Sequence, residues 1–256
     1  MTTILSVSRA AFLEAWANRR SFWFQVTIMV INDLALIAFW LLFFQRVGEI
    51  RGWGTQQVMT LYSVLAIVAG LTLGLFSNCR RLGQAISQGE LDAVLTLPLH
   101  PLAFLLARRV NTAMLGDLVF GPLLFIVAAH PTPQRLAVLL LSVACGSMIL
   151  LSFLVMLGSL AFFAGDRGEG GELGFQAILI LASYPLDMFG GLTKILLFTV
   201  LPAAFITGVP VHLIDDFSWR GAAVLVGVAG IAAAGAMAVF RAGLRKYRSG
   251  AAWTRA

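Results

Sequence analysis

The sequence predicts an all-α protein that crosses a membrane several times. Of its 256 residues, 59% are hydrophobic and only 12% are charged, and the mean hydropathy is +0.90. Soluble domains carry roughly a quarter charged residues. Several apolar runs are long enough to cross about 30 Å of hydrocarbon as helices. These observations indicate a polytopic membrane protein rather than a soluble domain.

The basic residues lie beside the ends of the apolar runs. A net charge of +6 is also found in proteins that bind nucleic acid. Lys and Arg at the ends of membrane spans, however, are typical of the side that faces the anionic cytoplasmic leaflet. We therefore expect the lipid bilayer, and not nucleic acid, to be the partner of these charges.

The first residues predict a helix that lies along the membrane surface. In residues 3–18, Leu5, Phe12, Leu13 and Trp16 fall on roughly one helical side. A disordered tail is the alternative. The charged residues Arg9 and Glu14 interrupt the apolar pattern, so we expect no cleavable signal peptide.

Six apolar regions predict six membrane spans in a single domain of residues 1–256. They cover about 21–44, 58–76, 110–129, 136–163, 175–209 and 221–240. The fifth region is too long for one simple span, and Tyr184-Pro185, Gly190-Gly191 and Pro202 interrupt it. We expect a span followed by a short helix or re-entrant excursion, which lipid tolerates only where protein covers it or it lines a wet cavity.

The distribution of charge predicts the orientation. With six spans, both termini, residues 80–109 and a glycine-rich turn over 166–174 would lie on one side of the membrane. That side then holds 13 of the 18 Lys and Arg residues, and the other side holds Arg46, Arg51, Arg135, Lys194 and Arg220. The excess of positive charge predicts that both termini are cytoplasmic.

The segment of residues 80–109 is too polar for a span and too regular for a loop. Leu82, Ala85 and Ile86 follow one helical face, and a second stripe follows Gly89. Glu90 and Asp92 would then stand in the first turn of the second piece, where acids complement the helix dipole. We expect Pro98 and Pro101 to end it. The segment is either a plain interfacial linker or a docking element for another protein.

Several acids lie inside or beside the predicted spans. Asp33 follows Asn32 near the middle of the first span. A charge at this depth normally faces protein or a cavity, so Asp33 either lines a path or bonds to a neighbouring helix. For Asp117, in the third span, we favour a structural role. Asp187 and Lys194 are seven residues apart and either bracket an outer gate or lie in the headgroup layer.

The chain carries no recognisable catalytic, nucleotide-binding or metal-binding pattern. No phosphate-binding G-x-x-x-x-G-K-[ST] occurs, and His100, His130 and His212 lie in separate turns. Cys79 and Cys145 are isolated thiols. We expect no catalytic residue, metal or cofactor in this chain. Aromatic residues near the predicted span ends, Trp40 and Trp53 among them, are explained as interfacial belts.

A short motif then suggests a family. The pattern G-E-L-D-x-x-L-x-x-P-L, at Gly89, Glu90, Leu91, Asp92, Leu95, Pro98 and Leu99, resembles the cytoplasmic motif of ABC transporter permeases of the type-2 export class. The layout is similar too, with six spans, an interfacial amino-terminal helix and a broken element before the sixth span. In that broken element the family's Tyr-Pro and later Pro-Ala-x-Phe appear here as Tyr184-Pro185 and Pro202 to Phe205.

The resemblance implies a membrane subunit whose coupling helix docks on a separate ATPase. The contact would be made by Gln84, Gln88, Gly89, Glu90, Leu91, Asp92, Leu95 and Pro98. Two ABC ATPase subunits would hold ATP and Mg, and a second permease subunit, identical or paralogous, would complete the complex in a bacterial-type inner membrane. The path would lie among spans one, two and five, which hold Gln25, Asn32, Asp33, Tyr62 and Tyr184, with Asp187 and Lys194 at the outer gate.

Two classes of function remain open on the sequence. The first is ATP-driven export of a small hydrophobic, amphipathic or cationic compound. The alternative is an ATP-independent ion- or proton-coupled carrier that uses Asp33 or Asp117. Inverted repeats would favour a carrier, but residues 21–76 and 110–163 show no convincing similarity. An intramembrane enzyme is disfavoured because no polar constellation of catalytic type is present.

Overall fold

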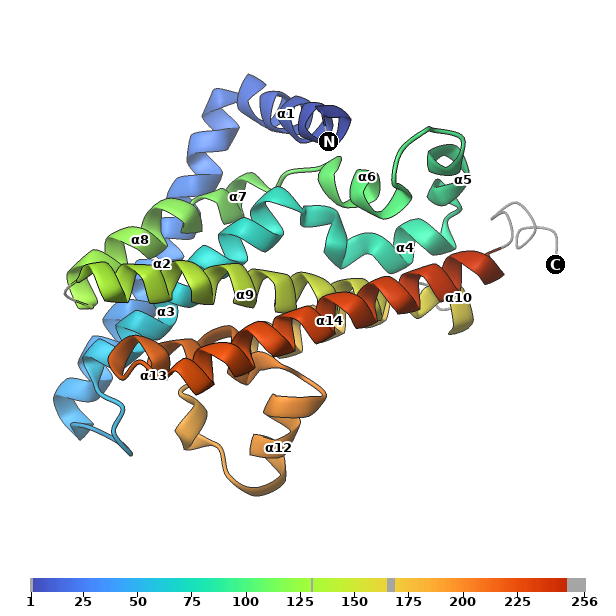
Figure 1. The fold of residues 1–256 in the computed structure, drawn as a ribbon. Coiled ribbons are helices and arrows are strands. Elements are labelled where there is room, and N and C mark those ends of the chain that lie inside the picture. The colour runs from blue at the N-terminus through green and yellow to red at the C-terminus, as the bar shows by residue number, and fades with distance from the viewer. Residues whose placement is uncertain (1, 130, 165–168, 248–256) are drawn as a thin grey trace.

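A computed structural model describes residues 2–129, 131–164 and 169–247, and its regular structure over these ranges is helical (Figure 1). Five helical segments there are long and apolar enough to cross a membrane. They are α2 (Arg19–Val47), α3 (Thr55–Ala69) with η1 (Gly70–Gly74), α7 (Thr112–Leu115) with α8 (Asp117–Ala128), α9 (Pro133–Ser159) with α10 (Ala161–Ala164), and α14 (Trp219–Lys246). The all-α polytopic class is confirmed.

The fifth apolar region is broken, as its prolines and glycines predict. It contains α11 (Glu169–Ala182), η3 (Leu186–Met188), α12 (Gly191–Thr199), η4 (Ala204–Gly208) and α13 (Val209–Asp215). The chain bends by 76° between α12 and the η4–α13 helix, the geometry of a broken span or a re-entrant loop. Gly191 has a φ of +55°, which L side chains rarely adopt.

The start of α11 corrects one expectation. A glycine-rich turn was predicted over residues 166–174, but α11 already begins at Glu169. Residues 165–168 lie outside the described part of the chain. With 14 residues, α11 reaches about 21 Å, which is less than the hydrocarbon thickness. The chain after α11 then turns at Pro185, whose nitrogen cannot donate a helical hydrogen bond.

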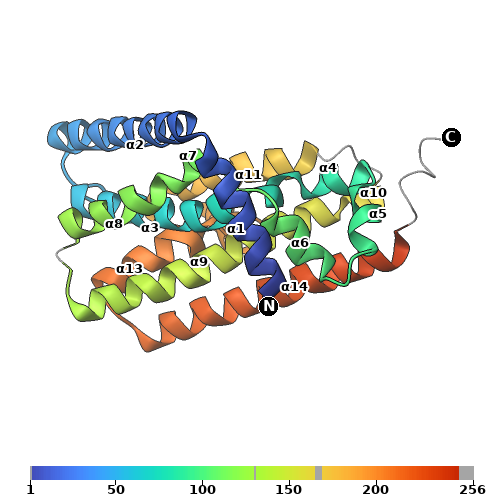
Figure 2. The ribbon, with the colours of Figure 1, turned by 90° about the horizontal axis from the view of Figure 1, so that it is seen from above.

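The amino-terminal helix α1 (Thr2–Ala17) confirms the helix predicted over 3–18 and excludes the disordered alternative. It packs against α6 (Pro101–Ala107) and meets α2 at a sharp corner (Figure 2). Asn18 caps α2 by accepting a hydrogen bond from the Ser21 amide at 3.2 Å. Trp16 packs edge-to-face on Phe22, with ring centroids 4.9 Å apart, and stabilises the corner.

The centre of the bundle is a close contact between α3 and α8. Ser63, which is fully buried, donates a hydrogen bond of 2.8 Å to the carbonyl of Gly121. A Cβ atom at Gly121 would lie 2.5 Å from Cγ1 of Ile67 and 2.9 Å from the carbonyl oxygen of Ser63. Small residues permit such approaches between helices, which matter in lipid because apolar burial alone gives little drive for association.

Helix α2 lies along one edge of the bundle (Figure 2). Its buried side chains are Phe22, Ile37, Trp40 and Phe44, and only 11% of its apolar window is buried within the chain. Most of its apolar surface therefore faces lipid or another protein chain.

The loops gather at two opposite ends of the bundle (Figure 1). One end carries α4 (Leu82–Ser87), α5 (Glu90–Leu95), α10 and the last turn of α14. The other carries the turn over residues 48–54 and the connection from α13 to α14. Part of the segment of residues 80–109 and the last turn of α14 thus lie at the same end of the bundle.

The α3–α8 contact gives a first prediction. Gly121→Ala should lower the stability by roughly 1–3 kcal/mol, because the added methyl group overlaps Ile67 and the backbone of Ser63. Thermal melting of the detergent-purified chain measures this loss. Gly227→Ala is the control, since nothing lies within 4 Å of a Cβ at that position of α14. Equal melting temperatures for the two variants would contradict a steric role for Gly121.

Candidate functional site

The segment between the second and third spans consists of short helices at one end of the bundle. After the single turn η2 (Ser77–Arg81) come α4, α5 and α6. Gly89 separates α4 from α5 with a φ of +75°, so the predicted break is confirmed. The prediction for Pro101 is wrong. This proline begins α6, because its fixed φ and missing N–H suit the first turn of a helix.

Helices α4 and α5 have a buried side and an exposed side. Leu82, Ile86, Leu91 and Val94 pack into the core. The exposed side carries Gln84 and Gln88 on α4, then Leu95, Leu97 and Pro98 at the end of α5. Leu95 is 44% exposed and Leu97 is 40% exposed. These five residues are hereafter the exposed patch.

Three other residues of the predicted contact differ in exposure from the exposed patch. Leu91 is fully buried and so contributes to packing rather than to the outer surface. Glu90 forms an ion pair with Arg108, and Asp92 is half-buried. The surface that is free to contact another protein therefore includes only some of the residues of the sequence motif.

The segment is firmly attached to the membrane helices. Arg80 forms an ion pair of 2.5 Å with Glu172 of α11, and its guanidinium lies 4.0 Å from the ring centre of Phe175. Leu82 approaches α9 so closely that a Cβ on Gly158 would lie 2.8 Å from it. These contacts connect the segment to α9 and α11.

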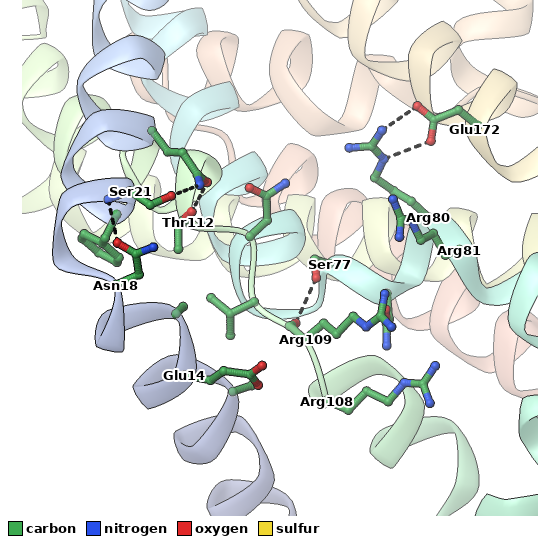
Figure 3. Close-up of a pocket in the computed structure, with 17 residues that line it drawn as sticks. Glu14, Asn18, Ser21, Ser77, Arg80, Arg81, Arg108, Arg109, Thr112 and Glu172 are labelled. Atoms are coloured by element: carbon green, nitrogen blue, oxygen red, sulfur yellow. Dashed lines mark hydrogen bonds and ion pairs between the residues drawn. The ribbon is translucent and has the colours of Figure 1, made fainter.

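A polar pocket of about 920 Å³ lies beside this segment (Figure 3). It is lined by the end of α1, the start of α2, η2, residues 108–112 and Glu172. Arg80, Arg81, Arg108 and Arg109 line it (Figure 3). Burial, and then the charge of Arg109, lower the pKa of Arg108.

Two acids from different spans meet inside the bundle. The carboxyl groups of Asp33 on α2 and Asp117 on α8 lie within hydrogen-bonding reach of each other. Asp117 is only 2% exposed, and each acid keeps one buried oxygen without a hydrogen-bond partner among the residues that the structure describes. The two acids are far apart in the sequence, and the structure brings them together.

Further along α2, Trp40 joins two of the predicted path residues. Its indole nitrogen donates a 2.9 Å hydrogen bond to the hydroxyl of Tyr62. Its ring meets that of Tyr184 at a centroid distance of 6.2 Å. Gln25, near the other end of α2, donates to Ser21 and accepts from Thr112, whereas Asn32 is exposed.

At the end of the bundle opposite the exposed patch, Asp187 collects several donors. Lys194 donates to its carboxylate at 2.9 Å, Trp53 donates at 3.0 Å, and Nε2 of His212 lies 3.0 Å away. Arg51 donates to the Asp187 carbonyl at 2.9 Å. Burial alone would raise the pKa of Asp187, but the donors and the positive charges of its neighbours hold it below the usual value.

A comparison with known families decides the assignment. Residues 30–251 match the family described as ABC-2 family transporter protein. The chain belongs to the ABC-2 transporter family. No curated protein sequence matches it. As an ABC-2 family transporter with several apolar helices, it is a multi-pass membrane protein, and the permease-like motif of residues 89–99 lies within the matched range.

For three side chains in the polar clusters of this ABC-2 transporter, the sequence did not reveal the contacts that they make. Trp40 and Trp53 were assigned to interfacial belts, but they are 5% and 1% exposed and each donates a hydrogen bond. Asp117 was given no partner. A spacing of four, three and four residues places four side chains of α2 on one helical face, which could have been predicted to point inward. They are Asp33, Ile37, Trp40 and Phe44. No comparable local signal exists for Trp53.

The Asp187 cluster gives a prediction with a defined pH dependence. Because the pKa of Asp187 is lowered below 3.8, its stabilising contribution is full at neutral pH and is lost as the pH falls below that value. Asp187→Asn should cost about 1 kcal/mol at pH 7, and the cost should shrink as the pH falls below 3.8, as measured by thermal melting. Asp216→Asn, a change at an exposed acid, is the control. A deficit that stays the same size from pH 7 to well below pH 3.8 would mean that the charge is not responsible.

Proposed function

We propose that this chain is the permease subunit of an ATP-driven ABC exporter. The observation that carries the proposal is the exposed patch, in which Leu95, Leu97 and Pro98 stand beside Gln84 and Gln88 on helices whose other side is buried. An apolar patch with a polar rim on a rigid helix is typical of a protein interface. In this family the fitting partner is an ABC ATPase, two copies per complex, which would bind ATP and Mg.

The attachment of the patch supports a role in transmitting movement. Arg80 reaches α11 through Glu172, Leu82 lies on α9, and Glu90 pairs with Arg108 at the end of α6, shortly before the third span. An ATPase that contacts the patch differently before and after hydrolysis would shift the balance between two arrangements of these spans. Coupling in this scheme needs no nucleotide site within the permease itself.

The orientation follows from the charges. We place the exposed patch and both termini in the cytoplasm, because the end with α4, α5 and the last turn of α14 carries most of the basic residues. The membrane is then the inner membrane of a bacterial-type cell.

The path for the substrate is proposed along the inward face of α2. Polar groups follow one another there, from Gln25 through Asp33 and the Tyr62–Tyr184 aromatic cluster to Asp187 with Lys194. Since α2 is exposed on its other faces, a second permease subunit, identical or paralogous, would complete the wall. Apolar spans that carry a few acids suit a small hydrophobic, amphipathic or cationic compound.

The pairing of Asp33 with Asp117 favours one other function. Two carboxyl groups in contact inside a membrane are suited to share a proton, as in an ion- or proton-coupled carrier. A carrier needs no ATPase and moves its substrate without nucleotide. The exposed patch is what this alternative leaves unexplained.

The docking hypothesis is tested on the exposed patch. Leu95→Asp with Leu97→Asp should abolish co-purification of the ATPase subunit, because it puts two charges into an apolar contact without touching buried Leu91. The full complex is purified from a strain that expresses the neighbouring genes, and its ATPase activity is measured. Arg241→Asp, which introduces an acid at an exposed position near the end of α14, is the control. Normal ATPase binding by the double variant would leave the segment as a linker.

The path hypothesis is tested at Asp33. Asp33→Asn should reduce transport several-fold while leaving assembly and ATPase binding intact, because the amide keeps the size of the side chain but not its charge. Transport by the reconstituted complex is compared with that of Asp216→Asn, where an acid outside the spans is neutralised. Unchanged transport would remove Asp33 from the path.

A further inference from the structure

The polar pocket beside α1 has an excess of positive charge. Four arginines and two glutamates line its 920 Å³ volume. Glu172 is already paired with Arg80, and Arg108 is paired with Glu90. Among the residues the structure describes, Arg81 and Arg109 have no ion-pair partner, and both are exposed to the pocket.

The backbone that carries these arginines is fixed. The hydroxyl of Ser77 donates to the carbonyl of Arg109 at 3.0 Å, and the amide of Asn111 donates to the carbonyl of Gly74 at 2.9 Å. Asn78 is buried and donates to the carbonyl of Leu105 at 2.7 Å. Hydrogen bonds thus join the segment of residues 74–78 to the segment of residues 105–111. A ligand would therefore meet the two guanidinium groups on a preformed wall.

Further polar side chains line the pocket at the start of α2. Asn18, Ser21 and Gln25 line it from the α1–α2 corner. In Figure 3, Glu14 on α1 and Asn18, the residue that caps α2, lie across the pocket from Arg80 and Arg81. Beyond the pocket, α2 continues with exposed Phe24, Ile28 and Ile31. A charged headgroup in the pocket can therefore extend its acyl chains along an apolar helix surface.

We propose that this pocket binds the phosphate headgroup of an anionic amphiphile from the cytoplasmic leaflet, with Arg81 and Arg109 as the residues that contact the phosphate. Planar guanidinium groups bind phosphate oxygens through paired hydrogen bonds. The molecule is either a resident membrane phospholipid or a phosphate-bearing substrate at the start of its path. The inference rests on the proposed function only in placing the pocket at the cytoplasmic face.

The test is a binding experiment that needs neither ATP nor an ATPase. The full chain, purified with any subunits that accompany it, is titrated in detergent with dioleoyl phosphatidylglycerol or dioleoyl phosphatidylcholine, and bound lipid is counted by native mass spectrometry. We expect a preference for phosphatidylglycerol of roughly 25-fold, since each of the two arginines near an anionic lipid is worth about fivefold in affinity.

Variants separate the pocket from general surface charge. Arg81→Gln with Arg109→Gln should abolish the preference, and Arg81→Gln with Arg109→Lys should retain part of it. Arg241→Gln with Arg245→Gln removes the same charge from exposed positions on α14 and should leave the preference unchanged. No preference in the wild type, or equal losses in the two Gln pairs, would overturn the proposal. Arg109→Gln alone serves as the test if the double variant melts at a lower temperature than wild type.

A second arm identifies the source of the phosphate. The complex is reconstituted in phosphatidylcholine vesicles with a trace of fluorescent phosphatidylglycerol, and its movement between leaflets is followed with and without ATP. Binding with ATP-dependent movement assigns the phosphate to the transported molecule, and binding without movement assigns it to a resident lipid. Failure of the proposed function appears separately, as loss of ATPase co-purification with wild type.

Discussion

The contact between α3 and α8 through Gly121 is the constraint on which the other features depend. It brings the two backbones together, and the hydrogen bond from Ser63 to the Gly121 carbonyl joins them. Asp117 begins α8, so the same contact sets where the acid pair forms. Leu118 packs on Gly70 of η1, just before the chain leaves the span for the η2 turn. The positions of the inner polar groups and of the external segment are therefore both set from this pair of helices.

The membrane-spanning helices could be predicted because their signal is local. Each span is visible in the sequence as a continuous apolar run. The break at Gly89 is also local, because glycine adopts a positive φ more readily than other residues. The site was less predictable because its contacts are long-range. Trp53 is 134 positions from Asp187, and no feature of either neighbourhood indicates the bond. Pro101 was misread because the same residue can end one helix or begin the next.

The two ends of the molecule have different chemistry. One end combines an exposed apolar patch with arginines in ion pairs or beside a pocket, which suits contact with a soluble subunit and with anionic headgroups. The other end is held by Asp187, whose bonds reach the turn before α3, the helix α12 and the helix α13. Between them, α2 contributes a polar inward face. In the proposed function, these features would serve for docking, for a path and for closure of the far end, and a partner would cover α2.

The close approach of Leu82 to Gly158 also sets the mechanics of the docking segment. With no side chain on Gly158, α4 rests almost directly on the α9 backbone, and no flexible rotamer lies between them to absorb a displacement. Within the segment, Glu90 of α5 pairs with Arg108 at the end of α6 through two long side chains, which can extend or rotate while they stay paired. The segment thus has a stiff contact with α9 and a compliant contact between its own helices. A force on the segment would reach α9 most directly, and through their long contact it would reach α14.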